Sequence, residues 1–157
     1  MKISIATEDI LTEEIMVKVI SSNEKFEIGH KLGKQGNGYL VNKLNNFNEL
    51  AKSSAVVVVF DLDLKPCPEK FRSSLESKVV NKRDSLQLIV SVREIESWIL
   101  ADRMGFSSYF KVSKDKIERN PDGLLDPKEK IINLAKQSKD SAIKRGMSPA
   151  AGAASKV

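Results

Sequence analysis

The chain has 157 residues, of which 41% are hydrophobic, and this length and composition predict a single domain with a substantial core. Its one cysteine, Cys67, excludes an internal disulfide bond and a zinc site built from several cysteines of one chain. The formal net charge is +5, and no run approaches the roughly 20 apolar residues that span a bilayer, so a membrane protein is not expected.

The charge is unevenly distributed along the chain. Residues 1 to 110 hold 15 Lys or Arg against 15 Asp or Glu, whereas residues 111 to 157 hold 11 against 6. A basic excess of this kind is typical of a surface that binds a polyanion, and equally of a solvated lysine-rich tail. Both interpretations stay open at this stage.

The first predicted element is a strand at residues 2 to 6. No signal-peptide pattern accompanies this strand, so we expect a cytoplasmic protein. After a turn at Thr7 to Asp9, apolar residues at near-helical spacing predict a helix from Leu11 to Val19. Phe26 and Ile28 indicate a short second strand. The four glycines in residues 29 to 38 predict a loop.

The rest of the chain continues the alternation of helices and strands. A helix with Leu40, Leu44, Phe47 and Ala51 on one face precedes an uninterrupted apolar strand at 55 to 60. The elements expected beyond it are a polar helix at 69 to 80, a strand at 86 to 92, a helix at 93 to 104, a turn at 120 to 123, a helix at 127 to 136 capped by Asp126, and a flexible end at 147 to 157.

This order of elements predicts an α/β fold. Strands that alternate with helices favour a doubly wound, mainly parallel sheet with flanking helices. We expect residues 1 to 110 to form this α/β domain and residues 111 to 157 to form a basic helical extension of the same domain.

Carboxylates follow three of the predicted strands, as Glu8, the pair Asp61 and Asp63, and Glu96. The carboxyl ends of parallel strands meet at one edge of a sheet, so these side chains are predicted to converge. Residues two apart in a strand point the same way, which would align Asp61 with Asp63. Oxygen ligands suit Mg²⁺ or Mn²⁺. Helix capping or solvation is the ordinary alternative for each carboxylate, but Asp-Leu-Asp directly after a β-branched run is more specific.

The strand ending in a glutamate and the later strand ending in Asp-x-Asp resemble the Toprim domain of topoisomerases, primases and overcoming-lysogenization-defect nucleases. The chain is more closely similar to a small, uncharacterised family of bacterial Toprim-like proteins. The segments that carry this resemblance are ATEDILTEE (6 to 14), FEIGHKLGKQGNGYL (26 to 40), VVFDLDLKPCP (58 to 68), VREIESWILAD (92 to 102) and DPKEKIINLAKQS (126 to 138).

The resemblance implies a role for each carboxylate. Glu8 would be the proton-transfer residue and a metal ligand, and Asp61 and Asp63 would bind magnesium. Glu96 would be an additional acidic ligand, with Trp98 packed beneath it. Toprim enzymes commonly have glycine where this chain has Asp9, and relatives in the close family are expected to continue beyond the final Ser-Lys-Val.

The resemblance implies a Mg²⁺-dependent nuclease that cleaves DNA or RNA. It also implies a role in bacterial defence against phage, beside a separate ATPase. The basic residues predicted to contact nucleic acid are Lys31, Lys34, Lys65 and Arg93. The alternative is a non-catalytic module that binds nucleic acid or protein. Self-association stays open.

Two other phosphate chemistries fit the sequence poorly. Haloacid-dehalogenase phosphatases share an Asp-x-Asp after a strand, but they normally have Thr or Val where this chain has Leu64. The segment from Gly29 to Gln35 is one residue shorter than a Walker loop and has Gln where Ser or Thr would bind magnesium. His30 is the only histidine, which excludes a histidine-rich metal site within one chain.

Overall fold

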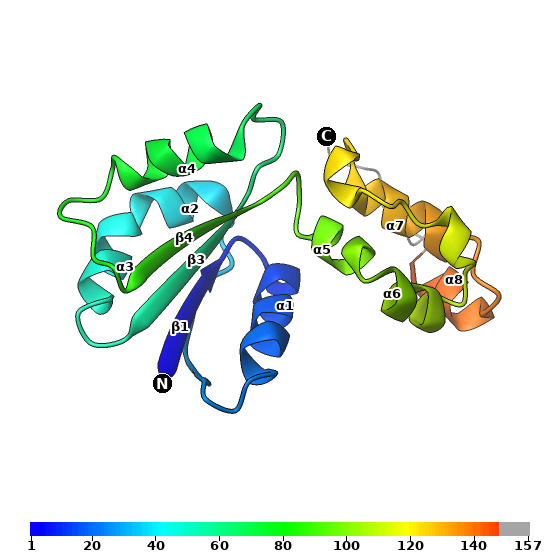
Figure 1. Ribbon diagram of the computed structural model, residues 1–157, viewed down its shortest axis with the longest axis horizontal. Helices are drawn as coiled ribbons and strands as arrows, with labels where there is room; N and C mark the ends of the chain where they lie inside the picture. The colour runs from blue at the N-terminus through cyan, green and yellow to red at the C-terminus, as the bar shows by residue number, and fades with distance from the viewer. Residues whose placement is uncertain (148–157) are drawn as a thin grey trace. The chain divides into compact units, whose positions relative to one another are not determined.

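The computed structural model describes residues 1–147, which form two compact units. The first unit is Met1–Ile95, and the second begins at Glu96 (Figure 1). No helix among the described residues has the length and apolar character needed to cross a membrane.

The first unit is a four-stranded parallel sheet with helices on both faces. Its elements are β1 (Lys2–Thr7), α1 (Ile10–Ser21), β2 (Glu27–Gly33), α2 (Gly36–Asn42), α3 (Leu44–Leu50), β3 (Ala55–Asp61), α4 (Pro68–Glu76) and β4 (Leu86–Ser91). The strand order is β2-β1-β3-β4, and all three strand pairs are parallel. Helix α1 lies on one face of the sheet, and α2, α3 and α4 lie on the other (Figure 1). The predicted doubly wound α/β fold is confirmed.

The core of the first unit lies between the sheet and the helices α2 to α4. Strand β3 is central because Val56, Val58 and Phe60 are apolar and fully buried, and its backbone bonds to a neighbour on each side. The predicted apolar helix face from Leu40 to Ala51 is buried in the same core. It is divided between two helices, however, because Lys43, with φ −99° and ψ 4°, separates the end of α2 from the start of α3.

The prediction of a loop at residues 29 to 38 is wrong. Strand β2 continues to Gly33, and α2 begins at Gly36. The glycines serve close strand packing: a Cβ on Gly29 would lie 2.7 Å from Ser4 Oγ, and one on Gly33 would lie 2.2 Å from the Thr7 carbonyl oxygen. Gly33 also has a φ of +94°, which favours glycine over any side chain. Here the glycines allow β2 to lie against β1.

The second unit is helical. It contains α5 (Glu96–Ala101), α6 (Arg103–Phe110), the short 3₁₀ helices η1 (Lys114–Lys116) and η2 (Pro121–Gly123), α7 (Pro127–Ala135) and α8 (Ser141–Gly146). The single helix predicted at 93 to 104 is wrong, because the Asp102 side chain accepts the Gly105 N–H and thereby starts α6 as a separate helix. The predicted α7 is confirmed, with Asp126 as its cap.

The second unit begins earlier than the basic extension predicted from residue 111. Leu100 and Phe106 lie before that point, yet they pack in one buried cluster with Ile131 and Leu134 of α7. The boundary follows this shared apolar cluster, which the charge distribution could not reveal. The flexible end predicted at 147 to 157 lies outside the described residues after Met147.

Candidate functional site at the carboxyl edge of the sheet

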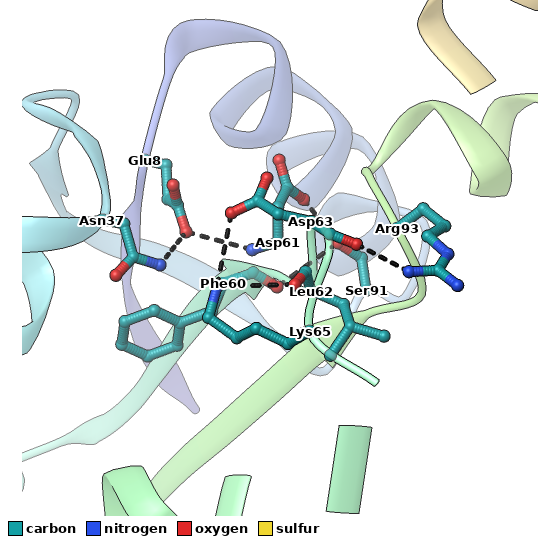
Figure 2. A network of polar contacts seen from close by, with 9 residues as sticks. All are labelled: Glu8, Asn37, Phe60, Asp61, Leu62, Asp63, Lys65, Ser91 and Arg93. Carbon is teal, nitrogen blue, oxygen red and sulfur yellow. Dashed lines mark hydrogen bonds and ion pairs between the residues drawn. The ribbon is translucent and has the colours of Figure 1, made fainter. Parts of the chain in front are cut away.

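The strand order creates a switch point between β1 and β3. From β1 the chain proceeds to β2 on one side, whereas from β3 it proceeds to β4 on the other. Doubly wound sheets bind ligands outside the carboxyl ends of the strands at such a point. Glu8 directly follows β1, and Asp61 is the last residue of β3. The backbone N–H of Asp61 donates to Glu8 Oε1 at 3.0 Å, so the two strand ends meet (Figure 2).

Glu8 is held in place by the start of α2 as well as by β3. Asn37 Nδ2 donates to Glu8 Oε1 at 2.9 Å, and the Gly36 N–H donates to the Glu8 carbonyl at 3.0 Å. Burial raises the pKa of Glu8 above 4.5 and outweighs the hydrogen bonds from Asn37 and Asp61, which lower it. The negative charge of Asp63 raises this pKa further, and Lys65 lowers it. The site therefore favours the protonated form of Glu8 more than water does.

Asp61 is positioned by the neighbouring strand. Its Oδ1 accepts a short hydrogen bond of 2.5 Å from Ser91 Oγ, and Asp61 and Ser91 are register partners in the β3–β4 ladder. Ser91 is fully buried, so its hydroxyl cannot easily turn away to solvent. The Asp61 carboxylate is consequently fixed at the end of the strand.

Asp63 reaches the same region by a different route from the one predicted. Strand β3 ends at Asp61, and Asp63 has a left-handed φ of +51°, so strand alternation does not align the two aspartates. Instead, the Asp63 N–H donates to the Arg93 carbonyl at 2.8 Å, and Arg93 Nη1 donates to the Asp63 carbonyl at 3.0 Å. Figure 2 shows the Asp61 and Asp63 side chains directed to the same side of this turn. We call Glu8, Asp61 and Asp63 the carboxylate edge.

Lys65 lies beside the carboxylate edge as a counter-charge. Its Nζ is 3.4 Å from Asp63 Oδ2 and 3.4 Å from the Leu62 carbonyl oxygen, and it lies 4.2 Å from the centre of the Phe71 ring. The ammonium group thus has a carboxylate, a carbonyl and an aromatic face around it. Its contact with nucleic acid stays a prediction.

The carboxylate edge suits a metal that takes few protein ligands. Among the residues described, no group of three or more His, Cys, Asp or Glu side chains is arranged to hold a metal ion. Mg²⁺ is commonly bound by one or two carboxylates together with water and substrate phosphate. Asp61 and Asp63 are oxygen donors of this kind, and the magnesium site predicted here stays a prediction.

The remaining predicted site residues are Glu96, Lys31 and Lys34. Glu96 opens α5 in the second unit, and its role as a metal ligand stays a prediction. Lys34 Nζ is 2.9 Å from Glu13 Oε2, and Lys31 Nζ is 3.6 Å from carboxylate oxygens of both Glu13 and Glu14. Lys31 in β2 and Lys34, directly after it, thus form ion pairs with α1 that neutralise part of their charge. Their contact with nucleic acid also stays a prediction.

Asp9 follows Glu8 without backbone strain. Its φ is −142°, an extended conformation that any residue adopts, and its Oδ1 accepts the Thr12 N–H at 2.8 Å as the cap of α1. Sequence reasoning missed Asn37 and Ser91. The only available signals were a polar residue between two glycines and a serine at the end of an apolar strand, and neither is specific.

Searches of protein families, of curated proteins and of solved structures found no match for this chain. The Toprim resemblance therefore stays a prediction, and the functional argument depends on the geometry of the carboxylate edge.

Proposed function

We propose that the protein is a Mg²⁺-dependent nuclease that hydrolyses phosphodiester bonds at the carboxylate edge. The observation that carries the proposal is the hydrogen bond from the Asp61 N–H to Glu8 Oε1, which joins two residues 53 positions apart at the switch point of the sheet. This is where doubly wound sheets place their ligands. The sequence resemblance to Toprim enzymes supports the same assignment of roles.

The residues of this edge suit different parts of the reaction. Asp61 and Asp63 would hold the metal ion, which when bound would neutralise phosphate charge and activate water. Glu8 suits proton transfer, because its raised pKa keeps a larger fraction of it protonated and able to donate to a departing hydroxyl oxygen. Asn37 orients the Glu8 carboxyl group for that step.

The test is cleavage of supercoiled plasmid and of single-stranded DNA and RNA in Mg²⁺ or Mn²⁺, beside an Asp61→Asn variant. Asparagine can still accept the Ser91 hydrogen bond but carries no charge, so we expect cleavage to fall by about a thousandfold or more. Asp84→Asn is the matched control, because Asp84 is exposed and precedes β4, away from the carboxyl ends of the strands. Equal activity of wild type and Asp61→Asn would refute the proposal.

A second candidate function is a non-catalytic module that binds nucleic acid or protein. The observation that favours it is the ion pair between the Lys65 ammonium group and the Asp63 carboxylate. Lys65 thereby supplies the positive charge that a metal ion would otherwise supply beside Asp63. In this case the protein would bind nucleic acid equally well in EDTA and in Mg²⁺ and would cleave none of the substrates. The Lys65→Met variant would then neither gain metal affinity nor acquire cleavage.

A further inference from the structure

The second unit contains a basic hollow that lies outside the carboxylate edge. Its volume is about 400 Å³, and its cationic lining residues are Arg103, Lys116, Arg119 and Lys130. They come from α6, η1, the segment after η1, and α7, so the fold of the second unit gathers them. No predicted site residue lies among them.

Arg103 is fixed by the backbone of η1 and the residue that follows it. Its Nε donates to the Ile117 carbonyl at 3.2 Å, and its Nη2 donates to the Lys114 carbonyl at 2.9 Å. These bonds use Nε and Nη2 of a guanidinium that carries five N–H donors in all. A permanently charged group held in this way needs little further ordering when it binds an anion.

The other cations give the basic hollow a net positive charge. Its acidic lining residues are Asp115 and Glu118, so cations outnumber carboxylates by four to two. Lys116 is oriented by a 2.8 Å hydrogen bond from its Nζ to Gln137 Oε1. The excess charge suits a phosphate-bearing ligand, and Asp115 and Glu118 limit how much negative charge it can accept.

The lining also indicates which part of such a ligand is recognised. Among the described residues that line the hollow, Ile117 is the only apolar one, and it is buried; none of them is aromatic. A base would find no surface on which to stack, whereas a phosphate would find guanidinium and ammonium donors. This composition favours the backbone of a strand over a free nucleotide.

We propose that the basic hollow binds phosphate groups of a single-stranded nucleic acid, as a contact separate from the residues that cleave it. The choice of nucleic acid as ligand rests on the proposed nuclease function. The affinity of the hollow for phosphate rests on Arg103 and the charges around it.

The test compares two triple variants of the full chain. Lys116→Gln/Arg119→Gln/Lys130→Gln removes three charges from the hollow and leaves Arg103, which ties the backbone, unchanged. Lys136→Gln/Lys139→Gln/Arg145→Gln removes the same three charges from exposed positions of the second unit outside the lining. Anisotropy of a fluorescein-labelled single-stranded oligonucleotide in EDTA measures binding without cleavage, over a series of salt concentrations. Thermal melting checks that both variants are folded.

We expect the hollow variant to bind the oligonucleotide at least about tenfold more weakly than wild type at low salt. The slope of log binding constant against log salt concentration should also become shallower by about 2, because three charges are removed and each single-strand phosphate contact contributes about 0.7. The control variant should lose no more than about threefold. Equal losses in the two variants would overturn the proposal, because the effect would then be one of overall charge.

Two further arms distinguish the ligand source and the proposed function. The hollow variant could bind the oligonucleotide as wild type does and yet lose binding of inorganic phosphate. This result would overturn the proposal that the hollow binds a nucleic-acid strand and would identify it as a site for free phosphate. Asp61→Asn should retain oligonucleotide binding. If no variant or wild type cleaves, but the hollow variant alone loses binding, the nuclease proposal fails and the hollow proposal stands.

Discussion

The two units of this protein assemble charged groups in different ways. The first unit is almost neutral, with 14 basic and 13 acidic residues in 1 to 95, and its carboxylate edge is built from residues far apart in sequence. The second is more basic, with 11 basic and 8 acidic residues in 96 to 147, and three of its four hollow cations lie between residues 103 and 119. A parallel sheet gathers distant strand ends, whereas a short helical unit relies on near neighbours.

This difference affects how firmly each site is held. Glu8 and Asp61 are joined by a direct hydrogen bond, and Asp61 is fixed in turn by Ser91 from the next strand. In the basic hollow, Arg103 is the cation whose side chain the described residues bind to the backbone, through hydrogen bonds to the carbonyls of Ile117 and Lys114. We therefore expect substitutions around the sheet edge to change geometry, and substitutions in the hollow to change mainly charge.

The largest effect should come from breaking the β1–β2 contact that positions the residues after β1. Gly33→Ala is expected to lower the free energy of unfolding by about 3 kcal/mol, because Cβ would meet the Thr7 carbonyl and the φ of +94° strains any side chain. Chemical denaturation measures the loss. Gly38→Ala is the control, since its Cβ meets nothing within 4 Å in the helix α2 and should be neutral or stabilising. Similar losses in both variants would contradict the packing argument.

A smaller effect is expected in the second unit. Arg103→Gln should cost about 2 kcal/mol of stability, because the carbonyls of Lys114 and Ile117 lose hydrogen bonds from a charged donor. Denaturation followed by the fluorescence of Trp98, the only tryptophan, reports on this unit. Among the described residues, the Arg119 side chain shows no such bonds to carbonyls, so Arg119→Gln should stay within about 0.5 kcal/mol of wild type. Equal stability of all three proteins would show that the Arg103 bonds are not formed in solution.

The sequence predicts those features of the fold and of the two sites that depend on residues close together in the chain. The strand at 55 to 60 and the helix opened by Asp126 and Pro127 follow from local apolar pattern and capping, and both are confirmed. The placement of Asp63 by Arg93 depends on a pairing 30 residues away, which no local pattern contains. The role of Gly33 likewise became visible only once β2 was seen against β1.

The hydrogen bond from Ser91 to Asp61 should contribute less than either packing or Arg103. Ser91→Ala is expected to lower stability by about 1 kcal/mol, since the hydroxyl donates to a carboxylate that keeps some access to water. Differential scanning calorimetry measures this change. Ser91→Ala should lower the free energy of unfolding by less in an Asp61→Asn background than in the wild type. An equal loss of stability in both backgrounds would show that the bond does not involve the Asp61 charge.

The smallest effect should be the pH dependence that Glu8 confers. Since burial raises the pKa of Glu8 above 4.5, the folded state binds this proton more tightly than the unfolded chain does. The contribution to stability is therefore complete below pH 4.5 and is lost as pH rises through the folded-state pKa. Glu8→Gln keeps an oxygen acceptor for Asn37 but cannot ionise. Its melting temperature relative to wild type should rise from about pH 4 to about pH 7. The exposed control Glu24→Gln should show no such trend, and a falling difference for Glu8→Gln would reverse the sign of the argument.

The most direct test of the central claim is a double-mutant cycle on single-turnover cleavage in Mg²⁺ with Glu8→Gln, Asp61→Asn and the combined variant. If Glu8 and Asp61 form one reaction site, each single variant loses most activity and the double variant is hardly worse than the poorer single variant. Losses that multiply, or single variants that cleave as fast as wild type, would contradict the claim that the carboxylate edge is one phosphodiester-cleaving site.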